Sequence, residues 1–329
     1  MQNTHLSPDS DEFWDWSWDE MAEYDLPAMV DYALQVSGQE QLYYVGHSQG
    51  SLMAFAGLSK NKELEKKIKM FFALGPVTTV GHMTSPLRYL AAFVPELQFL
   101  LNMFGVKEFM PSSKITQWLA ADLCSSPADA WCENIVFVLC GFDKANFNES
   151  RMPVYLSHSP AGTSVKDMIH FAQMVSSGQF QMYDYGFKKN NLAKYNQTTP
   201  PLYYPEYIST PTVLYWGGQD LLADPEDVEL LIPRLRNLRH SVYIPQYDHL
   251  DFIWGTDSPH WVYEPIIKTI WQEEARGEGV EAGEDVSEDD GEESESSVSE
   301  AILDYYRKIE AQRQNDVAAI HDQAAKSDM

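Results

Sequence analysis

Residues 43–52 read YYVGHSQGSL, in which Ser48 stands between Gly46 and Gly50, directly after an apolar run. A turn that passes from a strand straight into a helix forces the residue at the turn into strained backbone angles. We expect side chains at positions 46 and 50 to collide in such a turn, so that glycine fits both. The strain would lift the Ser48 hydroxyl clear of the sheet, at a helix N-terminus. The stretch therefore has the G-x-S-x-G pattern of a nucleophile elbow.

The residues beside Ser48 have their own predicted roles. The backbone amide of Gln49 would point at an oxyanion formed on a substrate, because the first N–H groups of a helix face outward. His47, inside the elbow, is predicted to pack or hydrogen-bond locally. A tight turn that contains a serine incidentally is the alternative interpretation of this stretch.

A serine hydroxyl is a weak nucleophile until a base takes its proton, and the base needs a partner that holds its tautomer. Proteins with a nucleophile elbow present these groups in the chain order serine, acid, histidine. VLYWGGQD places Asp220 after a late apolar run and two glycines that free the loop, and VYIPQYDHLDFIWG places His249 after the last run. We predict Asp220 as the acid and His249 as the base, with His240 as a rival base.

Other titratable residues have structural interpretations. Asp224 precedes Pro225 and is predicted to cap a helix. Asp248 and Asp251 are too close in sequence to His249 to orient its ring and are predicted to be surface or loop-bonding carboxylates. Structural roles are also predicted for the histidines in the middle of the chain, His82, His158 and His170. No HExxH pattern occurs, so neither a metal site nor a cofactor is predicted.

Apolar runs alternate with helix-forming segments along the chain. The runs cover residues 42–45, 68–74, 212–216 and 241–244. A capping box over 17–20, a helix from about residue 25 to Gly38 and a helix over 51–58 are predicted from the residues between and before them. This alternation is typical of α/β architecture with a parallel sheet.

Some 130 residues between the second and third runs differ in character, with helix-forming aromatic segments such as PLRYLAAFVPELQFLLNMF. We predict core over residues 1–80 and 208–272, an inserted cap over 81–207, and an acidic disordered linker with a helix-forming end over 273–329. That tail is strongly charged, because thirteen acidic residues and one arginine lie between positions 272 and 300.

The composition argues against several classes of protein. The net charge of −26 argues against nucleic-acid binding, which usually needs a basic face. The sequence contains no run of eighteen apolar residues, so a transmembrane helix is not predicted. The N-terminus MQNTHLSPDSDEF lacks the basic and apolar regions of a signal peptide. Three cysteines, Cys124, Cys132 and Cys140, allow at most one internal disulfide.

Five stretches together resemble the acid lipase family of α/β hydrolases, which includes gastric lipase and lysosomal acid lipase. They are DEFWDWSWDEMAEYDLPAMVDYAL, GHSQG, LSHSPAGTS, YYPEYISTPTVLYWGGQDLLADPEDV and YDHLDFIWG, between about residues 5 and 271. The resemblance implies an α/β-hydrolase fold with a mostly parallel sheet and an inserted helical cap that bears a lid. It also implies an esterase for triacylglycerols or cholesteryl esters. In that esterase Ser48 is the nucleophile, Asp220 the acid and His249 the base, and Gln49 supplies an oxyanion amide.

The resemblance further implies a disulfide between Cys124 and Cys132, a free Cys140, and a lysosomal or secreted location. Asn148 and Asn196 begin N-glycosylation sequons, which matter only on a secretory route. The N-terminus as written would instead leave the chain in the cytosol, where the cysteine pair would stay reduced. We expect a lipid ester as substrate, contact of the cap with a lipid-droplet or membrane surface, and no nucleic-acid partner; the oligomeric state is not predicted.

Members of the family carry, before the part matched here, a signal peptide, the first strands of the sheet, and a His-Gly loop that supplies a second oxyanion amide. We expect the chain to be truncated with respect to these parts, which would leave the strand at 42–45 with an open apolar edge. Loss of one oxyanion donor lowers turnover by on the order of 10²–10³. Two alternatives therefore stay open. One is a catalytically impaired isoform that binds lipid or a protein partner through the cap and tail, and the other is a carboxylesterase for small substrates.

Overall fold

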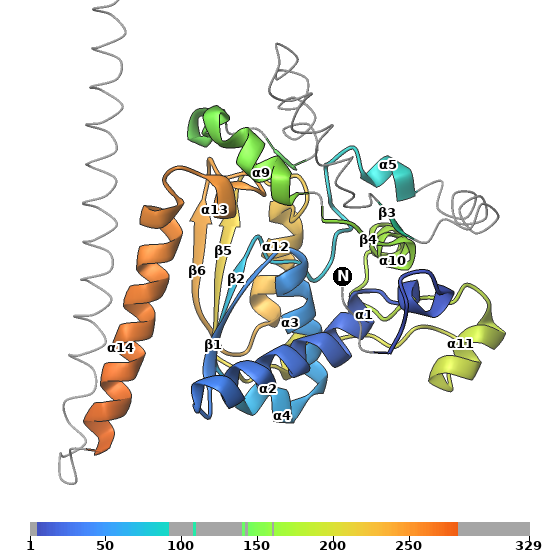
Figure 1. The fold of residues 1–329 in the computed structure, drawn as a ribbon, viewed down its shortest axis with the longest axis horizontal. Helices are drawn as coiled ribbons and strands as arrows, with labels where there is room; N and C mark the ends of the chain where they lie inside the picture. The colour runs from blue at the N-terminus through green and yellow to red at the C-terminus, as the bar shows by residue number, and fades with distance from the viewer. Residues whose placement is uncertain (1–4, 92–107, 110–139, 142–143, 160, 282–329) are drawn as a thin grey trace, which may run out of the picture. The chain divides into compact units, whose positions relative to one another are not determined.

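The computed structural model describes the chain except for residues 1–4, 92–107, 110–139, 142–143, 160 and 282–329 (Figure 1). The chain divides into two compact units, Met1–Ile270 and Trp271–Met329. Cys124 and Cys132, the aromatic segment from residue 92 and residues 282–329 of the predicted acidic tail lie outside the described residues. The prediction of disorder is wrong for residues 273–281, which continue the helix Glu264–Glu281.

A four-stranded parallel sheet is the centre of the first unit. Its strands are β1 (Leu42–His47), β2 (Ile68–Leu74), β5 (Thr212–Gly217) and β6 (Leu238–Ile244), in the spatial order β1-β2-β5-β6. The predicted α/β class with a parallel sheet is confirmed. β6 begins three residues before the apolar run at 241, because Leu238 and His240 already pair with β5.

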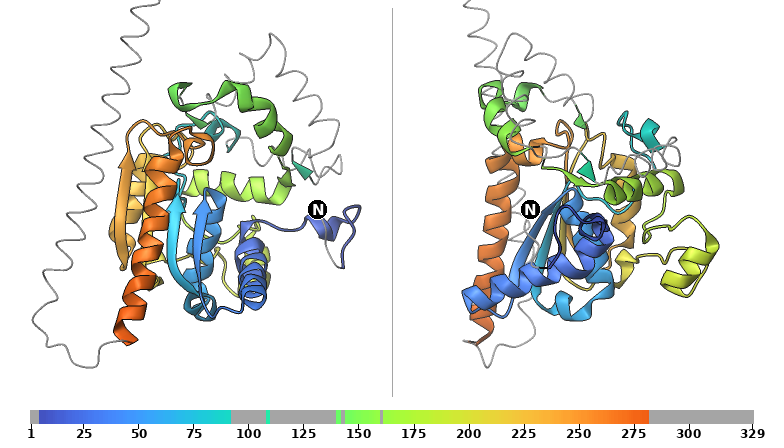
Figure 2. Two further views of the ribbon diagram at one scale, coloured as in Figure 1. Left: turned by 60° about the vertical axis from the view of Figure 1, so that its left-hand side comes forward. Right: turned by 45° about the vertical axis from the view of Figure 1, so that its right-hand side comes forward.

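Helices cover both faces of this sheet (Figure 1, Figure 2). Those of the core are α1 (Trp18–Glu20), α2 (Leu26–Ser37), α3 (Gln49–Lys60), α4 (Lys62–Lys66), α12 (Pro225–Leu231), α13 (Asp251–Trp254) and, up to Ile270, α14 (Glu264–Glu281). Shorter helical turns are Asp11–Trp14, Met21–Asp25, Ile232–Arg234 and Pro259–Tyr263. Successive side chains of a strand point to opposite faces. Phe71 of β2 accordingly belongs to the core cluster that includes residues of α2, α3 and α12, whereas Phe72 belongs to the cluster with Phe252 and Ile266.

Local sequence signals set several helix ends. Glu20 Oε2 accepts the N–H of Ser17 at 2.8 Å and Ser17 Oγ accepts that of Asp19 at 3.3 Å, so the predicted capping box is present. Gly38 ends α2 with φ 70°, and the Asp224 carboxylate caps α12 by accepting from the Glu226 N–H at 3.0 Å. The predicted ends of these helices are confirmed.

The described part of the predicted cap is mostly helical. Its helices are α5 (Arg88–Ala91), α9 (Met152–His158), α10 (Val165–Ser177) and α11 (Lys188–Tyr195), and its short 3-10 turns are Lys144–Asn146, Glu149–Arg151 and Pro205–Tyr207. The strands β3 (Glu108–Phe109) and β4 (Thr163–Ser164) pair in antiparallel fashion. The cap boundaries at 81 and 207 stay a prediction.

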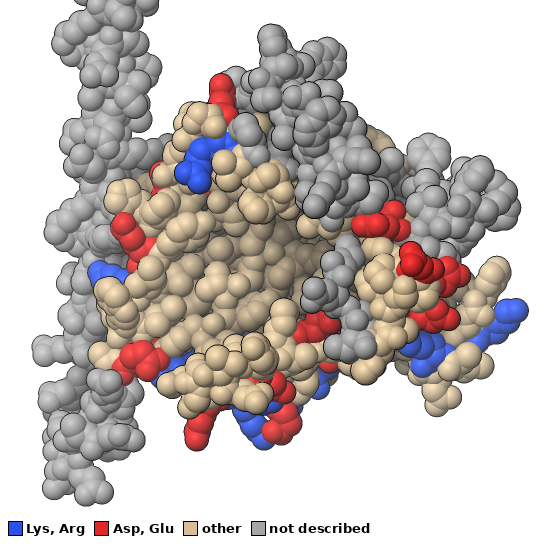
Figure 3. Space-filling model, in the orientation of Figure 1, with Lys and Arg blue, Asp and Glu red and all other residues tan. Residues whose placement is uncertain are grey.

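β1 forms one edge of the sheet among the described residues, whereas β2 and β5 lie between neighbours and are buried on both faces. Val45 in β1 is 48% exposed, and in Figure 3 the face around β1 is hollowed and almost free of charged side chains, which gather at its rim. An apolar edge strand of this kind is a site for pairing with another strand. None of the described helices has both the length and the apolar composition that a membrane crossing needs.

Candidate active site

Ser48 lies at the turn between β1 and α3, as predicted. Its backbone angles are φ 54° and ψ −119°, a conformation that residues other than glycine rarely adopt. Its N–H donates to the carbonyl of Leu74 at 3.0 Å, which ties the turn to the end of β2. The sharp turn leaves the Ser48 side chain above the carboxyl ends of the parallel strands, where open α/β sheets bind their ligands.

The two glycines of the elbow have different reasons to be glycine. A Cβ atom at Gly46 would lie 2.7 Å from the backbone oxygen of Gly50, which no side chain tolerates. A Cβ atom at Gly50 would meet only the hydroxyl of Tyr44, at 3.7 Å, an ordinary contact. The expectation that both positions would be crowded is therefore wrong for Gly50, because this residue already lies in α3, where an added Cβ atom would make only an ordinary contact.

Asp220 and His249 converge on Ser48 from the loops that follow β5 and β6. His249 Nε2 lies 2.7 Å from Ser48 Oγ, and His249 Nδ1 lies 2.8 Å from Asp220 Oδ2. Since a carboxylate accepts, Nδ1 carries the proton and the unprotonated Nε2 can accept from the serine hydroxyl. His249 and Asp220 are buried, and Ser48 is half-buried. Three residues far apart in the sequence are thus connected by two consecutive hydrogen bonds.

The surroundings favour a histidine that can carry a proton. Burial alone would lower the pKa of His249, but the charge and hydrogen bond of Asp220 and the charge of Asp248 outweigh it, so that the pKa lies above the ordinary 6.5. The second oxygen of Asp220 accepts the N–H groups of Leu222 at 2.9 Å and Ala223 at 2.8 Å. These bonds fix the carboxylate plane and with it the direction of the bond to His249.

The loop that carries His249 is ordered by carboxylates that sequence reasoning placed partly at the surface. Asp248 and Asp251 are loop-bonding as predicted, but both are buried rather than exposed. Asp248 Oδ1 accepts the N–H groups of Leu250 at 2.7 Å and Asp251 at 3.1 Å, and Asp251 Oδ2 accepts the N–H of Asp248 at 2.6 Å. Because a loop pressed against the protein cannot use water, its amides need these side-chain acceptors.

The sequence predicted that the two glycines before Asp220 free the loop. The structure gives them a different role, which is to allow close packing. A Cβ atom at Gly217 would lie 2.2 Å from the carbonyl oxygen of Tyr247, and one at Gly218 would lie 2.5 Å from that of Pro245. Their small size lets the segment that leads to the acid approach the segment that leads to the histidine.

Two residues of the site escaped sequence reasoning. Gly75, which follows β2 with φ +52°, lies so that a Cβ atom would be 3.3 Å from His249 Nδ1. Cys140 accepts the N–H of His249 and that of Leu221, both at 3.3 Å, through its backbone carbonyl. A glycine directly after a strand was a signal for the first residue. No local signal marks the second, because its role lies in a backbone atom.

The sequence of the chain is similar to those of known proteins. Residues 7–256 match the family model described as alpha/beta hydrolase fold. The chain is 48% identical over 270 residues to gastric triacylglycerol lipase of Rattus norvegicus, covering 82% of this chain and 68% of that protein. The chain belongs to the acid lipase family of α/β hydrolases.

A second relative of this acid lipase family member supports the same family. Lysosomal acid lipase/cholesteryl ester hydrolase of Homo sapiens is 47% identical over 266 residues, which cover 80% of this chain and 66% of that protein. The chain thus spans about two thirds of the length of these relatives. A crystal structure of a protein from Sulfolobus solfataricus shares the fold with a TM-score of 0.51 at 15% identity, over 82% of this chain and 70% of that chain.

The predicted oxyanion donor is the first amide of α3. The N–H of Gln49 donates to no acceptor in the described part of the chain. Ser51 stabilises the same turn, because its hydroxyl donates to the Ser48 carbonyl at 2.7 Å and accepts the Val77 N–H at 3.0 Å. The helix N-terminus beside Ser48 therefore offers an available donor in this lipase family fold.

His47 differs from its predicted role. Its Nε2 lies 2.8 Å from the carbonyl oxygen of His249, 202 residues away, so its bond is not local. The rival base His240 is exposed on β6 and takes no part in the site.

The histidines of the predicted cap lie elsewhere. His82 bonds to Asp227 and His170 is buried against Trp18, with ring centroids 4.1 Å apart. His158 is exposed near the end of α9. The candidate glycosylation residue Asn196 is exposed after α11, and Asn148 is half-buried.

Two further observations concern the cysteine near the site and possible metal ligands. Cys140 is free, and burial together with the charges of Asp248 and Asp220 raises the pKa of its thiol to about 12. Within the described ranges, no three His, Cys, Asp or Glu side chains group as a metal site would require.

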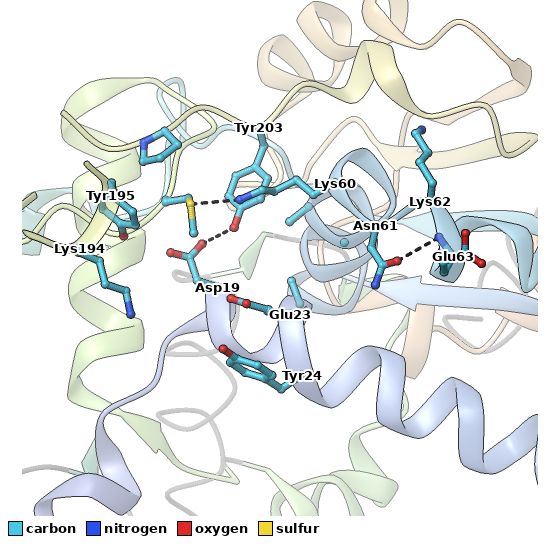
Figure 4. Close-up of a pocket in the computed structure, with 15 residues that line it drawn as sticks. Asp19, Glu23, Tyr24, Lys60, Asn61, Lys62, Glu63, Lys194, Tyr195 and Tyr203 are labelled. Atoms are coloured by element: carbon cyan, nitrogen blue, oxygen red, sulfur yellow. Dashed lines mark hydrogen bonds between the residues drawn. The ribbon is translucent and has the colours of Figure 1, made fainter. Parts of the chain in front are cut away.

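A cavity of about 640 Å³ lies apart from these residues, between the Met21–Asp25 turn, the end of α3 and the segment after α11 (Figure 4). Its wall includes Asp19, whose carboxylate accepts the Tyr203 hydroxyl at 2.8 Å and the Tyr183 N–H at 2.7 Å. Burial raises the pKa of Asp19 to about 7. The charged groups of this cavity are thus separate from Ser48 and its partners.

Proposed function

We propose that this chain hydrolyses ester bonds of neutral lipids, triacylglycerols or cholesteryl esters. The hydrogen-bonded chain from Ser48 Oγ through His249 to Asp220 carries the proposal, with distances of 2.7 and 2.8 Å. The substrate class is supported by relatives named gastric triacylglycerol lipase and lysosomal acid lipase/cholesteryl ester hydrolase.

The first half of the reaction forms an acyl-enzyme. Ser48 Oγ bonds to the ester carbonyl carbon while its proton passes to Nε2 of His249. The carbonyl oxygen becomes an oxyanion, which accepts the N–H of Gln49. The carbon–oxygen bond to the alcohol then breaks, and the alcohol leaves with the proton from Nε2. The buried Asp220 stabilises the imidazolium that forms in between.

The second half releases the fatty acid. A water molecule gives a proton to Nε2 of His249, and its oxygen bonds to the acyl carbon. The bond between that carbon and Ser48 Oγ breaks, and the serine regains its proton from the imidazolium. The enzyme returns to its starting state, with one ester and one water converted to an alcohol and a carboxylic acid.

The alternatives from the sequence are less well supported. An impaired isoform that only binds lipid or protein has no specific observation in its favour, whereas the ordered site and the relatives' names favour an enzyme. A carboxylesterase for small substrates shares the same site, and substrate chain length separates it from a lipase.

The location and the surroundings of the enzyme are also proposals. Relatives named gastric and lysosomal lipases support a secreted or lysosomal protein. There, glycosylation would take place at the exposed Asn196 and the half-buried Asn148, and Cys124 and Cys132 would be oxidised to a disulfide. We infer that the cap meets the substrate at a lipid surface, because long-chain esters are insoluble in water.

Fluorophosphonate labelling tests the proposal directly, since the probe reacts only with a serine that an adjacent base activates. We expect labelling of the folded chain and release of oleate from trioleoylglycerol or cholesteryl oleate. Ser48→Ala should abolish both, whereas Ser176→Ala, at an exposed position in α10, should retain both. Labelling without long-chain hydrolysis, but with cleavage of a butyrate ester, would favour the carboxylesterase. A folded chain that takes no label would contradict the proposal.

A further inference from the structure

His47 joins the nucleophile turn to the loop of the proposed base. It is the last residue of β1 and directly precedes Ser48, and its Nε2 lies 2.8 Å from the carbonyl oxygen of His249. A carbonyl oxygen only accepts hydrogen bonds, so Nε2 of His47 carries the proton and donates it. The bond therefore connects the backbone of the base to the residue beside the nucleophile.

The His249 backbone is held on both sides of its Cα atom. Its N–H donates to the Cys140 carbonyl at 3.3 Å, and its C=O accepts from His47. The two histidine rings are also in contact, with centroids 4.8 Å apart, and the His47 ring lies 6.1 Å from that of Phe252. With its backbone fixed, His249 needs only side-chain rotation to reach both Asp220 and Ser48.

We propose that His47 is a positioning residue, which holds the His249 backbone so that its Nε2 stays within hydrogen-bond distance of Ser48 Oγ. This inference rests on the proposed function. It assigns to the variable position of the G-x-S-x-G pattern a role that the pattern itself does not require.

The chemistry of histidine suits the role. Burial and the nearby His249 lower the pKa of His47 to about 4, so the ring is neutral in most conditions and still has one N–H to donate. A permanent cation here would oppose the imidazolium that forms on His249 during the reaction. A hydrophobic ring would fill the space but could not donate. Histidine thus supplies a rigid neutral donor.

Substitutions that keep or remove the donor test the proposal. His47→Phe removes it at similar volume, and His47→Asn is too short to reach the carbonyl. In contrast, the longer amide of His47→Gln can still donate to His249. We expect kcat for a soluble ester to fall on the order of 10–100-fold in the Phe and Asn variants, because small displacements of a catalytic group have effects of this size. KM should stay within about twofold, and the Gln variant should recover most of the loss. His240→Phe, at an exposed position, is the matched control and should behave as wild type.

A spectroscopic readout separates positioning from stability and from the proposed function itself. The proton on Nδ1 of His249, bonded to Asp220, should give a low-field NMR signal in the wild type and in His47→Gln. We expect it to weaken or exchange faster with solvent in the Phe and Asn variants. Equal kcat losses in the Gln and Phe variants, or an unchanged signal in all of them, would overturn the inference. If the wild type takes no fluorophosphonate, the proposed function fails while this NMR comparison still decides the role of His47.

Discussion

A Cβ atom added at Gly75 would lie 3.3 Å from Nδ1 of His249, the atom that bonds to Asp220. Gly75 also has φ +52°, so its close approach and its backbone angle both call for glycine. The turn after β2 thus forms a wall against the acid–histidine pair.

Gly75→Ala should therefore reduce both stability and activity. The positive φ costs an alanine about 1 kcal/mol, and the new methyl group displaces His249. Gly178→Ala is a matched control, because Gly178 has φ +61° but no atom within 4 Å of the added Cβ. We expect a similar loss of thermal stability in both variants and a loss of kcat in Gly75→Ala alone. Equal activities would show that the wall does not position the pair.

The glycines of the elbow should respond differently to alanine. Gly46→Ala should destabilise the protein by about 1–3 kcal/mol or prevent folding, because the added methyl group meets the Gly50 backbone. Gly50→Ala should be neutral or stabilising by up to about 1 kcal/mol, since alanine favours a helix over glycine. Denaturant unfolding of the two variants measures the difference. An equal loss in both would restore the expectation that both positions are crowded.

The acid limb of the pH profile should depend on Asp220. Only neutral His249 can accept the serine proton, so kcat/KM should fall as the pH drops through the raised pKa of His249. In Asp220→Asn the charge that raises this pKa is gone. The limb should then move to lower pH, while kcat falls by about 10⁴-fold because the tautomer is no longer held. An acid limb that stays in place in Asp220→Asn would assign it to another group.

Asp19 should make folding stability depend on pH. Burial raises its pKa from 3.8 to about 7, so between these values the folded chain binds more protons than the unfolded chain. This carboxyl group therefore contributes a loss of stability as the pH rises from about 4 to 7. Asp19→Asn removes that contribution.

The unfolding free energy of Asp19→Asn relative to wild type should accordingly rise between pH 4 and pH 7. Well below pH 3.8 the Asp19 carboxyl group is protonated in the folded and the unfolded chain, and the difference there gives the baseline for other effects of the substitution. Urea unfolding at several pH values measures it. A difference that does not change across this range would mean that Asp19 titrates normally.

Much of the sheet and the candidate triad could be predicted from the sequence, because their signals are local. The apolar runs and the helix ends are set by neighbouring residues, as at Gly38 and Asp224. Ser48 was found from its flanking glycines, and Asp220 and His249 from their positions after late strands. The carboxyl ends of parallel strands lie at one edge of a sheet, so the order along the chain was enough to bring these three together.

Only the tertiary structure decided which residues surround them. The bond from His47 to His249 spans 202 residues, and the carbonyl of Cys140 connects the acid and histidine loops through a backbone atom that every residue type possesses. The different needs of Gly46 and Gly50 likewise depend on where the backbone of α3 returns. Secondary structure follows from neighbours along the chain, whereas the space around a residue and its distant partners follow from packing, which one sequence does not reveal.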